Sequence, residues 1–528
     1  MSASSVVTID ELAMTIVERG GRPIDVWAVA ALLEAEGLRD LDAVERYGHR
    51  DIFHLADTVY PEALALAAAL PHFEHDPIER RSWLRRFAVR YIRGSFAALP
   101  MAVQILAILT LGYALWASLD FDESQATAVA VGTILSFIVT GGHVQAIGRL
   151  GLSYSAQGND LLADRVCRRL VRHGIVVAGI VAVILALVNV FTRSFELWVL
   201  AIALVYYALL AVLWLSTAIL YTVEKRLPIL LTVVVGIGAI WALRTVAPVS
   251  IYVAHWIGLL AANVLAWVWG RRVLRHRSDA VEGELRLAQL PRTSVLIHSV
   301  GPYFLYGTAY FTLLFADRVV AWSTADFRLP LVIWFRTPYE LGLDWALLTL
   351  VLTLALLEHV VHEFADASIP TQRRTSGLER DVHNRWFSRF YARQTAFLSV
   401  IAIGSVVAVY ALVLWSRRFS DNEQVRDFFT SPVTFQVFVL GAVGYALLGL
   451  ALMNASFFFT LSRPWPMLRA IGAGLATGIT VGYVLSRSVT YWWGAVGLTA
   501  GMATFALIST IEAVRLMRNL DYAYYSAY

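Results

Sequence analysis

Long apolar stretches recur along this chain from about residue 96 to its C-terminus, and short polar or basic segments separate them. Each stretch is about twenty residues long, which is the length that a helix needs to cross roughly 30 Å of hydrocarbon. We therefore expect an all-α, polytopic membrane protein with about twelve transmembrane helices.

The expected spans fall into two sets of six, which predicts two six-helix halves of equal topology. Their boundaries carry an uncertainty of about two to four residues. The first set is Phe96–Leu119, Ala126–Ile147, Gly174–Phe191, Leu197–Val223, Leu227–Leu243 and Ile251–Trp269, and the second is Val295–Trp322, Leu343–Val361, Thr395–Trp415, Val433–Leu461, Met467–Leu485 and Val489–Leu516.

The same pattern divides the whole chain into five parts. We expect a helical cytoplasmic N-terminal extension at residues 1–78, a basic amphipathic membrane-surface helix at 79–95, the first half at 96–270, a cytoplasmic connector at 271–294, and the second half with a C-terminal tail at 295–528.

Composition supports a membrane protein. Hydrophobic residues make up 58% of the chain, and its mean hydropathy is +0.63. A soluble domain is usually nearer about 45–50% apolar. The one cysteine, Cys167, has no second cysteine for a disulfide and no metal-ligand companion, so we expect neither cofactor nor metal.

The distribution of basic residues predicts the orientation of the chain. With the N-terminus in the cytoplasm, the inside segments carry about 32 Lys and Arg and the outside ones about 8. One outer loop departs from this, because Arg417, Arg418 and Arg426 outnumber Arg463 and Arg469 on the inside. We expect a bacterial inner-membrane protein with both termini in the cytoplasm and no cleaved leader.

The N-terminal extension has apolar residues at helical spacing over Val6–Arg19 and Asp25–Leu38, and a further short helix is expected over Glu62–Leu70, after Pro61. Two interpretations stay open: a folded addition that stabilises the membrane part, or a docking surface for a partner.

An arginine-rich segment follows the extension. At helical spacing it predicts a basic helix that lies on an anionic leaflet. Nucleic-acid binding is disfavoured because a span begins directly afterwards. The segment contains Arg80, Arg81, Arg85, Arg86, Arg90 and Arg93, interleaved with Trp83, Phe87 and Tyr91.

The two halves share a feature between their second and third spans. In both, this link is long, basic and expected in the cytoplasm: residues 149–173 in the first half and 362–394 in the second. A repeat of this kind is typical of transporters whose site lies between the halves, near the middle of the membrane.

Twelve spans with paired long second links resemble the MOP superfamily, which includes MATE-type multidrug exporters and flippases for lipid-linked oligosaccharides. Gly301 to Gly307, followed by Phe315 to Trp322, resembles the seventh helix of polysaccharide flippases, where an Asp-Arg or Asp-Lys pair closes the helix. The tail ending in Asn519 to Tyr522 is similar to that of the Pel exopolysaccharide transporters, and the eighth span, with Pro338 before it and Glu358 near its inner end, is similar too.

The resemblance implies a flippase that exports an exopolysaccharide or a lipid-linked glycan by alternating access, coupled to an ion. It also implies partners: a cytoplasmic glycosyltransferase and further subunits of a secretion complex. Such a protein is not an enzyme itself.

Ionisable groups at membrane depth are functional candidates because burying a charge there is costly. Asp317 and Arg318 come late in the seventh span; they could line an outward cavity, or they could end the helix as an interfacial pair with Trp322 as an anchor. Glu358 and His362 are four residues apart on one helix face, so they could hold a proton between them. A helix end that reaches the interface is the alternative.

Two histidines and one arginine are further candidates. His143 follows two glycines that would permit close helix approach, and His298 lies near the start of the seventh span. Both are candidates for ion coupling, although packed helix residues of this type are common. Arg149 could contact a pyrophosphate, or it could only orient the membrane helices.

Aromatic side chains supply the last candidates. Tyr303, Tyr306, Tyr310 and Phe311 form a helical stripe, and the three tyrosines could contact the faces of a sugar. Helix packing or contact with lipid is the alternative.

Other functional classes stay open. A membrane glycosyltransferase could use Asp120, Asp122 and Glu123 of the first outer loop, but the outer loops are short and no Gly-rich phosphate loop is present. A small-molecule exporter of the same fold is the nearest alternative, and a scaffold for a synthase complex is the third.

Overall fold

The computed structural model describes residues 8–20, 23, 25–69, 83–223, 226–246, 249–279, 290–324, 333–374, 380–416 and 430–525. Within these ranges the chain is helical apart from turns, loops and one isolated bridge between Tyr113 and Ser118. The predictions for Arg80, Arg81 and the loop with Arg417, Arg418 and Arg426 lie outside the described residues.

Within the described residues, twelve long helices form the bundle, as the apolar pattern predicts. They are α5 (Trp83–Leu111), α6 (Glu123–Ala156), α7 (Asp160–Thr192), α8 (Leu197–Thr222), α9 (Arg226–Val246), α10 (Ile251–Asp279), α11 (Thr293–Trp322), α12 (Thr337–Arg374), α13 (Arg380–Ser416), α15 (Pro432–Thr460), α16 (Trp465–Ser488) and α17 (Gly494–Arg518).

Ten of these helices are long and apolar enough to cross a membrane, and α5, which is bent, makes an eleventh. The remaining helix, α11, has 30 residues but is less apolar than the ten. An all-α fold with spans at these positions confirms the fold class that the sequence predicts.

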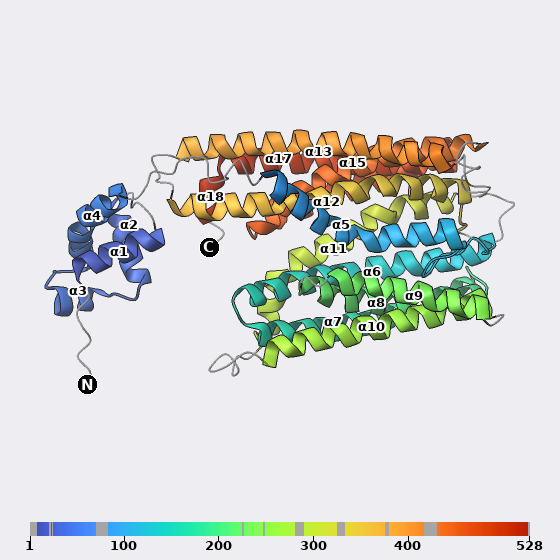
Figure 1. Ribbon diagram of the computed structural model, residues 1–528, viewed down its shortest axis with the longest axis horizontal. Helices are drawn as coiled ribbons and strands as arrows, with labels where there is room; N and C mark the ends of the chain where they lie inside the picture. The colour runs from blue at the N-terminus through green and yellow to red at the C-terminus, as the bar shows by residue number, and fades with distance from the viewer. Residues whose placement is uncertain are drawn as a thin grey trace.

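Helices α5–α10 make the first half and α11–α17 the second, and the two halves pack by one scheme. In the first half α6 packs on α8 and α9 packs on α10; in the second, α12 packs on α15 and α16 packs on α17. Counted along each half, the second helix packs on the fourth and the fifth packs on the sixth. In Figure 1 the second half lies above the first, with α5 and α11 running between them.

The first helix of each half crosses to the second helix of the other half. Thus α5 packs on α12, and α11 packs on α6. Glycines make the second crossing close: a Cβ added to Gly307 of α11 would lie 2.5 Å from the carbonyl oxygen of Gly141 on α6, and one on Gly142 would meet Phe304. This is the close approach that the glycines before His143 predict.

Helix α5 is bent by 54° between Arg85–Phe96 and Leu99–Ile108. Pro100 explains the bend, because it cannot donate a backbone hydrogen bond to the carbonyl of residue 96. The part before the bend joins the core of the second half and the part after it joins the core of the first. The expected span to Leu119 is too long: the helix ends at Leu111, before Gly112 with its φ of 82°.

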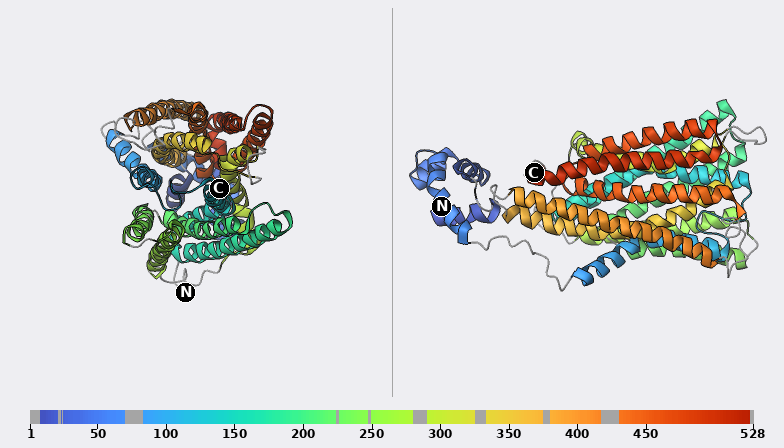
Figure 2. Two further views of the ribbon diagram at one scale, coloured as in Figure 1. Left: turned by 90° about the vertical axis from the view of Figure 1, so that its right-hand side faces the viewer. Right: turned by 90° about the horizontal axis from the view of Figure 1, so that it is seen from above.

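Both termini lie at one end of the bundle, which we call the proximal end; the opposite end is the distal end (Figures 1 and 2). At the proximal end the expected long links are almost wholly helical. Helix α6 has 34 residues, which corresponds to about 51 Å. Only residues 157–159 separate it from α7, and α12 and α13 are similarly extended, with 38 and 37 residues.

Four short helices form the N-terminal extension: α1 (Ile9–Gly20), α2 (Val26–Ala35), α3 (Asp40–Tyr47) and α4 (Ile52–Ala69). Buried apolar side chains from all four make a core of their own, among them Ala13, Val29, Ala43 and Leu55. The expected break at Pro61 is wrong, because α4 continues through it, and α3 was not predicted. Figure 2 shows this domain beyond the proximal end of the bundle.

The C-terminal tail forms α18 (Leu520–Tyr525), which packs on α13. Asn384 of α13 accepts a hydrogen bond from the backbone N–H of Leu520 at 3.1 Å and donates one to Asp521 at 2.9 Å. The tail is therefore fixed to the extension of α13.

Candidate functional site

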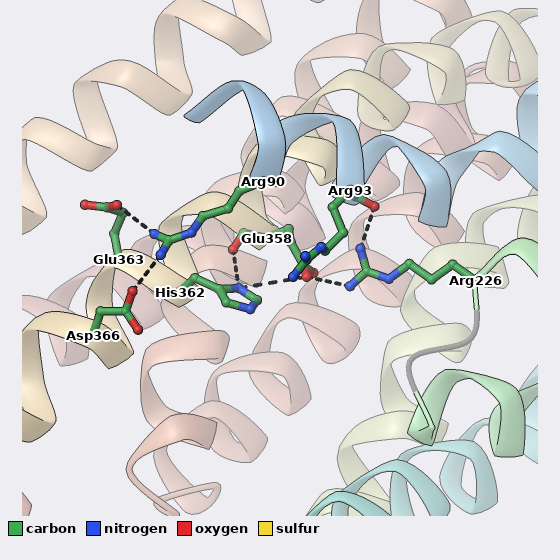
Figure 3. Close-up of polar contacts among 7 residues, drawn as sticks. All are labelled: Arg90, Arg93, Arg226, Glu358, His362, Glu363 and Asp366. Atoms are coloured by element: carbon green, nitrogen blue, oxygen red, sulfur yellow. Dashed lines mark hydrogen bonds and ion pairs between the residues drawn. The ribbon is translucent and has the colours of Figure 1, made fainter. Parts of the chain in front are cut away.

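Carboxylates of α12 face arginines of the first half at the proximal end (Figure 3). Arg226, at the start of α9, places Nη2 2.5 Å from Oε1 of Glu358 and donates from Nη1 to the carbonyl oxygen of Arg93 at 2.5 Å. Arg226 thus connects three helices: its own, α5 and α12. Glu358 is the carboxylate that the sequence selects, but its main partner is 132 residues away.

A second ionic contact lies one turn further along α12. Arg90 of α5 donates to Glu363 at 2.7 Å and to Asp366 at 2.6 Å, and Arg86 lies 3.6 Å from Glu363. The Glu363 side chain is 3% exposed and that of Arg90 is 15% exposed. Burial of this kind makes the loss of either partner costly, because the other charge is then left without compensation.

Glu358 and His362 are not a closed pair. His362 Nδ1 lies 3.8 Å from Glu358 Oε1, whereas it is 2.8 Å from the Glu358 carbonyl oxygen, to which it can donate. The His362 side chain is 40% exposed. The two residues are neighbours, but Arg226 is closer to the Glu358 carboxylate, at 2.5 Å, than His362 is, at 3.8 Å.

A buried charged cluster lies toward the distal end, between α11 and α12. Arg318 donates through Nε to Glu340 Oε2 at 2.9 Å and through Nη1 to the carbonyl oxygen of Leu314 at 3.1 Å. Trp322 donates to the other carboxylate oxygen of Glu340 at 3.0 Å. Glu340 is the residue that the sequence interpretation missed; its position three residues before the expected span is the signal that could have found it.

Asp317 has different partners from Arg318. Its Oδ2 accepts from the Tyr339 hydroxyl at 2.7 Å, and the Arg318 guanidinium is 3.9 Å from Oδ1. Oδ1 is buried without a hydrogen-bond donor. A cavity of about 10 Å³ lies beside Asp317, which is about the room that one water molecule needs. The lining is otherwise apolar: Leu313, Ala316, Leu475, Gly478, Ile479 and Leu498.

The interfacial alternative for this pair does not fit the structure. Asp317 and Arg318 are 5% and 4% exposed, and Trp322, suggested as a membrane-surface anchor, is 1% exposed. All three belong to the interior of the second half, because Glu340 and Tyr339 of α12 cover them.

The aromatic stripe of α11 is mostly packed between helices. Tyr303 and Tyr306 are 4% and 2% exposed and both contact the ring of Phe459 on α15. Arg149 lies 5.0 Å over the Tyr303 ring and donates to the Ser462 hydroxyl at 2.6 Å. In this conformation Arg149 of α6 joins the first half to the second, whereas the contacts of the two tyrosines with Phe459 lie within the second half.

The remaining candidates lie apart from the clusters. Tyr310 is half-buried and contacts Phe311. His143 is 1% exposed, bonds to His173 of α7 at 3.0 Å between ring nitrogens, and packs edge-on against Phe304. His298 is exposed near the start of α11.

The acidic residues of the first outer loop have structural partners. Asp120 pairs with Arg244 at 3.1 Å, Asp122 caps α6, and Glu123 accepts from the indole N–H of Trp334 at 2.8 Å. Trp334 belongs to the second half, so Glu123 joins the two halves at the distal end as the arginines do at the proximal end.

Solved structures with this arrangement of helices are known. The chain aligns with a multidrug resistance MATE family transporter of the MOP superfamily in its outward-facing conformation, with a TM-score of 0.54, 15% identity, 82% of this chain covered and 96% of the other. The inward-facing conformation of a transporter described in the same words gives a TM-score of 0.51 at 13% identity, with 81% and 94% covered. The fold is that of the MATE transporters.

A further structure with the MATE fold is a MOP superfamily transporter from Pyrococcus furiosus, whose binding pocket is described as having reverse polarity. It gives a TM-score of 0.52 at 15% identity, with 81% of this chain and 96% of the other covered. No protein-family model and no curated protein sequence matches the chain. Identities this low show the fold alone, so the roles of the charged residues rest on the geometry described above.

Proposed function

We propose that this chain is an ion-coupled exporter that moves an exopolysaccharide or a lipid-linked glycan outward across a bacterial inner membrane by alternating access. The proposal of a glycan substrate and of a Pel-like secretion system rests on the resemblance of the seventh helix to that of polysaccharide flippases and of the tail to that of the Pel transporters. A cytoplasmic glycosyltransferase would be the principal partner.

The observation that carries the proposal is the ionic contact between the halves at the proximal end. Arg226 belongs to the first half and Glu358 to the second. Arg90 lies on the part of α5 that packs in the core of the second half, so its pair with Glu363 fixes that part of α5 to α12. If the halves rock apart to admit a substrate, the Arg226–Glu358 pair must open. Water then solvates the separated charges, so this pair works as a gate that closes when the substrate has left.

The buried cluster supplies the coupling in this proposal. Asp317 has an oxygen without a hydrogen-bond donor beside a cavity for one water molecule, and this oxygen lies 3.9 Å from the guanidinium of Arg318, which pairs with Glu340. A proton or small cation that reached Asp317 would change the charge balance with Arg318. Such a change is one way to favour one arrangement of packed helices over another.

The test is polysaccharide secretion, measured by carbohydrate staining, in a deletion strain complemented with wild type, Glu358→Gln or Arg226→Glu. We expect deletion to abolish secretion, wild type to restore it, and both variants to fail at normal membrane abundance. The double variant Arg226→Glu with Glu358→Arg should recover part of the secretion, because it restores an ion pair. Unchanged secretion in the deletion strain would overturn the glycan proposal.

A small-molecule exporter is the second candidate, favoured by the solved structures, two of which are described as multidrug resistance transporters. Drug susceptibility of the same deletion strain separates the two. Increased susceptibility with normal secretion would favour this candidate, and the gate variants should then fail to restore resistance.

A further inference from the structure

The extension of α7 carries four arginines along one face, one helical turn apart. Arg165, Arg168, Arg169 and Arg172 line a groove of about 450 Å³ together with Leu290, which precedes α11. Three of the arginines are half-buried and Arg172 is exposed. Arg169 donates to the hydroxyl of Thr293, the first residue of α11, at 2.8 Å. The groove therefore lies between the two halves of the protein.

Positive charge prevails along this wall of the groove. Residues 160–173 contain four arginines and two carboxylates, a net charge of +2. The buried carboxylate of Asp164 pairs with Arg168, and the positive charges of Arg165 and Arg271 also attract it. Like charges one turn apart repel each other. An anion bound among the guanidinium groups would remove that repulsion.

The position along α7 sets the depth of the groove in the membrane. The apolar part of the helix begins near Gly174, two residues after Arg172. At 1.5 Å per residue, Arg172 lies about 3 Å and Arg169 about 8 Å beyond that point, whereas Arg165 lies about 14 Å beyond it. The headgroup layer is about 5–8 Å thick on each side of the hydrocarbon, so Arg172 and Arg169 lie at the depth of lipid phosphates.

We infer that this groove binds the phosphate group of a lipid, through the guanidinium groups of Arg169 and Arg172 in particular. Guanidinium matches phosphate oxygens because its planar fork donates two parallel hydrogen bonds. The phosphate could belong to a membrane phospholipid or to the carrier of a lipid-linked glycan. If the phosphate belongs to a glycan carrier, the groove is a site that anchors the substrate for export. This second assignment rests on the proposed export function.

Arg149, the pyrophosphate candidate that the sequence suggests, is a poorer choice. Its guanidinium is held between Ser462 and the ring of Tyr303. In contrast, the polar partner of Arg169 is a neutral hydroxyl, which a phosphate oxygen can replace.

The test measures binding to the purified full chain in detergent. The probes are phosphatidylglycerol, phosphatidylcholine and inorganic pyrophosphate. Binding of each probe is measured by native mass spectrometry and by the rise in the melting temperature of the protein. We expect phosphatidylglycerol to bind more tightly than phosphatidylcholine, and Arg169→Gln with Arg172→Gln to weaken it by about tenfold, which is about 1.4 kcal/mol.

A matched variant controls for the change in charge. Arg515→Gln with Arg518→Gln removes two arginines from the same end of the bundle and should leave the affinity within about twofold. Competition by pyrophosphate would support phosphate recognition that includes a glycan carrier; binding of phosphatidylglycerol without competition would support a membrane phospholipid. If the groove variant, the control and wild type bound phosphatidylglycerol with equal affinity, and pyrophosphate with equal affinity, the inference would be overturned. Secretion plays no part in this measurement, so the site and the export function can fail separately.

Discussion

At the scale of single residues, the buried charges of the second half show how a cluster is held together. Arg318 is 4% exposed, and its carboxylate partner is Glu340 at 2.9 Å, because Asp317 is directed to Tyr339 instead. Trp322 holds the second oxygen of Glu340. Glu340 therefore neutralises Arg318, and Asp317, its neighbour in sequence, is not needed for that purpose.

The first prediction concerns Glu340→Gln. It leaves the Arg318 charge buried with Asp317 3.9 Å away, so we expect a loss of about 3 to 5 kcal/mol of stability, as for other broken buried pairs. Thermal inactivation of the purified protein measures it. Glu512→Gln, which breaks the more exposed pair with Arg515, should cost less than about 1 kcal/mol. Equal losses for the two variants would contradict the assignment of Glu340.

The second prediction concerns acid stability of the N-terminal domain. The backbone N–H of His54 and the Arg50 side chain bond to Asp51 and lower its carboxyl pKa, and hydrogen bonds from the Arg39 backbone and side chain lower the pKa of Asp42. A carboxyl group whose pKa is lower in the folded state than in the unfolded chain stabilises the fold at every pH above its unfolded pKa, which is about 3.9 for aspartate. This stabilisation is lost as the pH falls through the lower pKa of the folded state.

We therefore expect the stability of this domain to decline below about pH 4. Urea unfolding at a series of pH values measures the decline, and Asp51→Asn should make it shallower. The control is Asp57→Asn, at an exposed position of α4, the helix that begins directly after Asp51. An identical pH profile for Asp51→Asn and wild type would contradict the prediction.

At the scale of elements, glycines decide how closely the halves approach each other. Gly141 and Gly142 of α6 face α11, and Gly307 of α11 faces α6. Without a Cβ at these positions the two backbones come close enough for wide van der Waals contact, which is the main attraction between helices in lipid. Gly94 gives α5 the same access to Ala355 of α12.

The third prediction compares two glycines in this region. Gly307→Ala places a Cβ 2.5 Å from the Gly141 carbonyl oxygen, which must push α11 away from α6. We expect a lower melting temperature and reduced export. Gly148→Ala on α6 meets nothing within 4 Å and should be neutral, or stabilising by up to about 1 kcal/mol. Tolerance of Gly307→Ala in both measurements would contradict the close crossing.

At the scale of the whole molecule, two halves exchange their first helices. Helix α5 belongs to the first half by sequence, yet its beginning packs in the core of the second, and α11 contacts α6 of the first half. The packed halves are in contact at the proximal end through Arg226 and Glu358, and at the distal end through Trp334 and Glu123. Transport would require these contacts to open in turn.

The fourth prediction concerns the N-terminal domain as a separate unit. Its four helices enclose their own apolar core, so residues 1–78 should fold without the membrane part. A domain this small is only marginally stable, and we expect a helical circular dichroism spectrum with a cooperative but low-temperature melt. Ala13→Asp, which buries a charge in that core, should abolish the transition. A non-cooperative melt of the wild-type fragment would show that the domain needs the rest of the chain.

The sequence by itself determined the class of fold and the place of the helices. Lipid requires about twenty apolar residues for each span, and that requirement is local, so it is visible in the chain. The predicted spans lie within the observed helices to within one residue, with two exceptions: α5 ends at Leu111 rather than Leu119, and α17 begins at Gly494 rather than Val489. The paired links were recognised as well, because their length and their charge are visible in the chain.

Only the tertiary structure decided which charges meet. Arg226 and Glu358 are 132 residues apart, and Arg90 and Glu363 are 273 apart. Nothing local predicts such pairs, because they depend on how α5 and α9 pack against α12. For the same reason Glu340 was overlooked, and the contact between Arg149 and Ser462 was not predicted. The local pattern selects groups that are costly to bury, and the packing of distant helices selects the partners that make their burial possible.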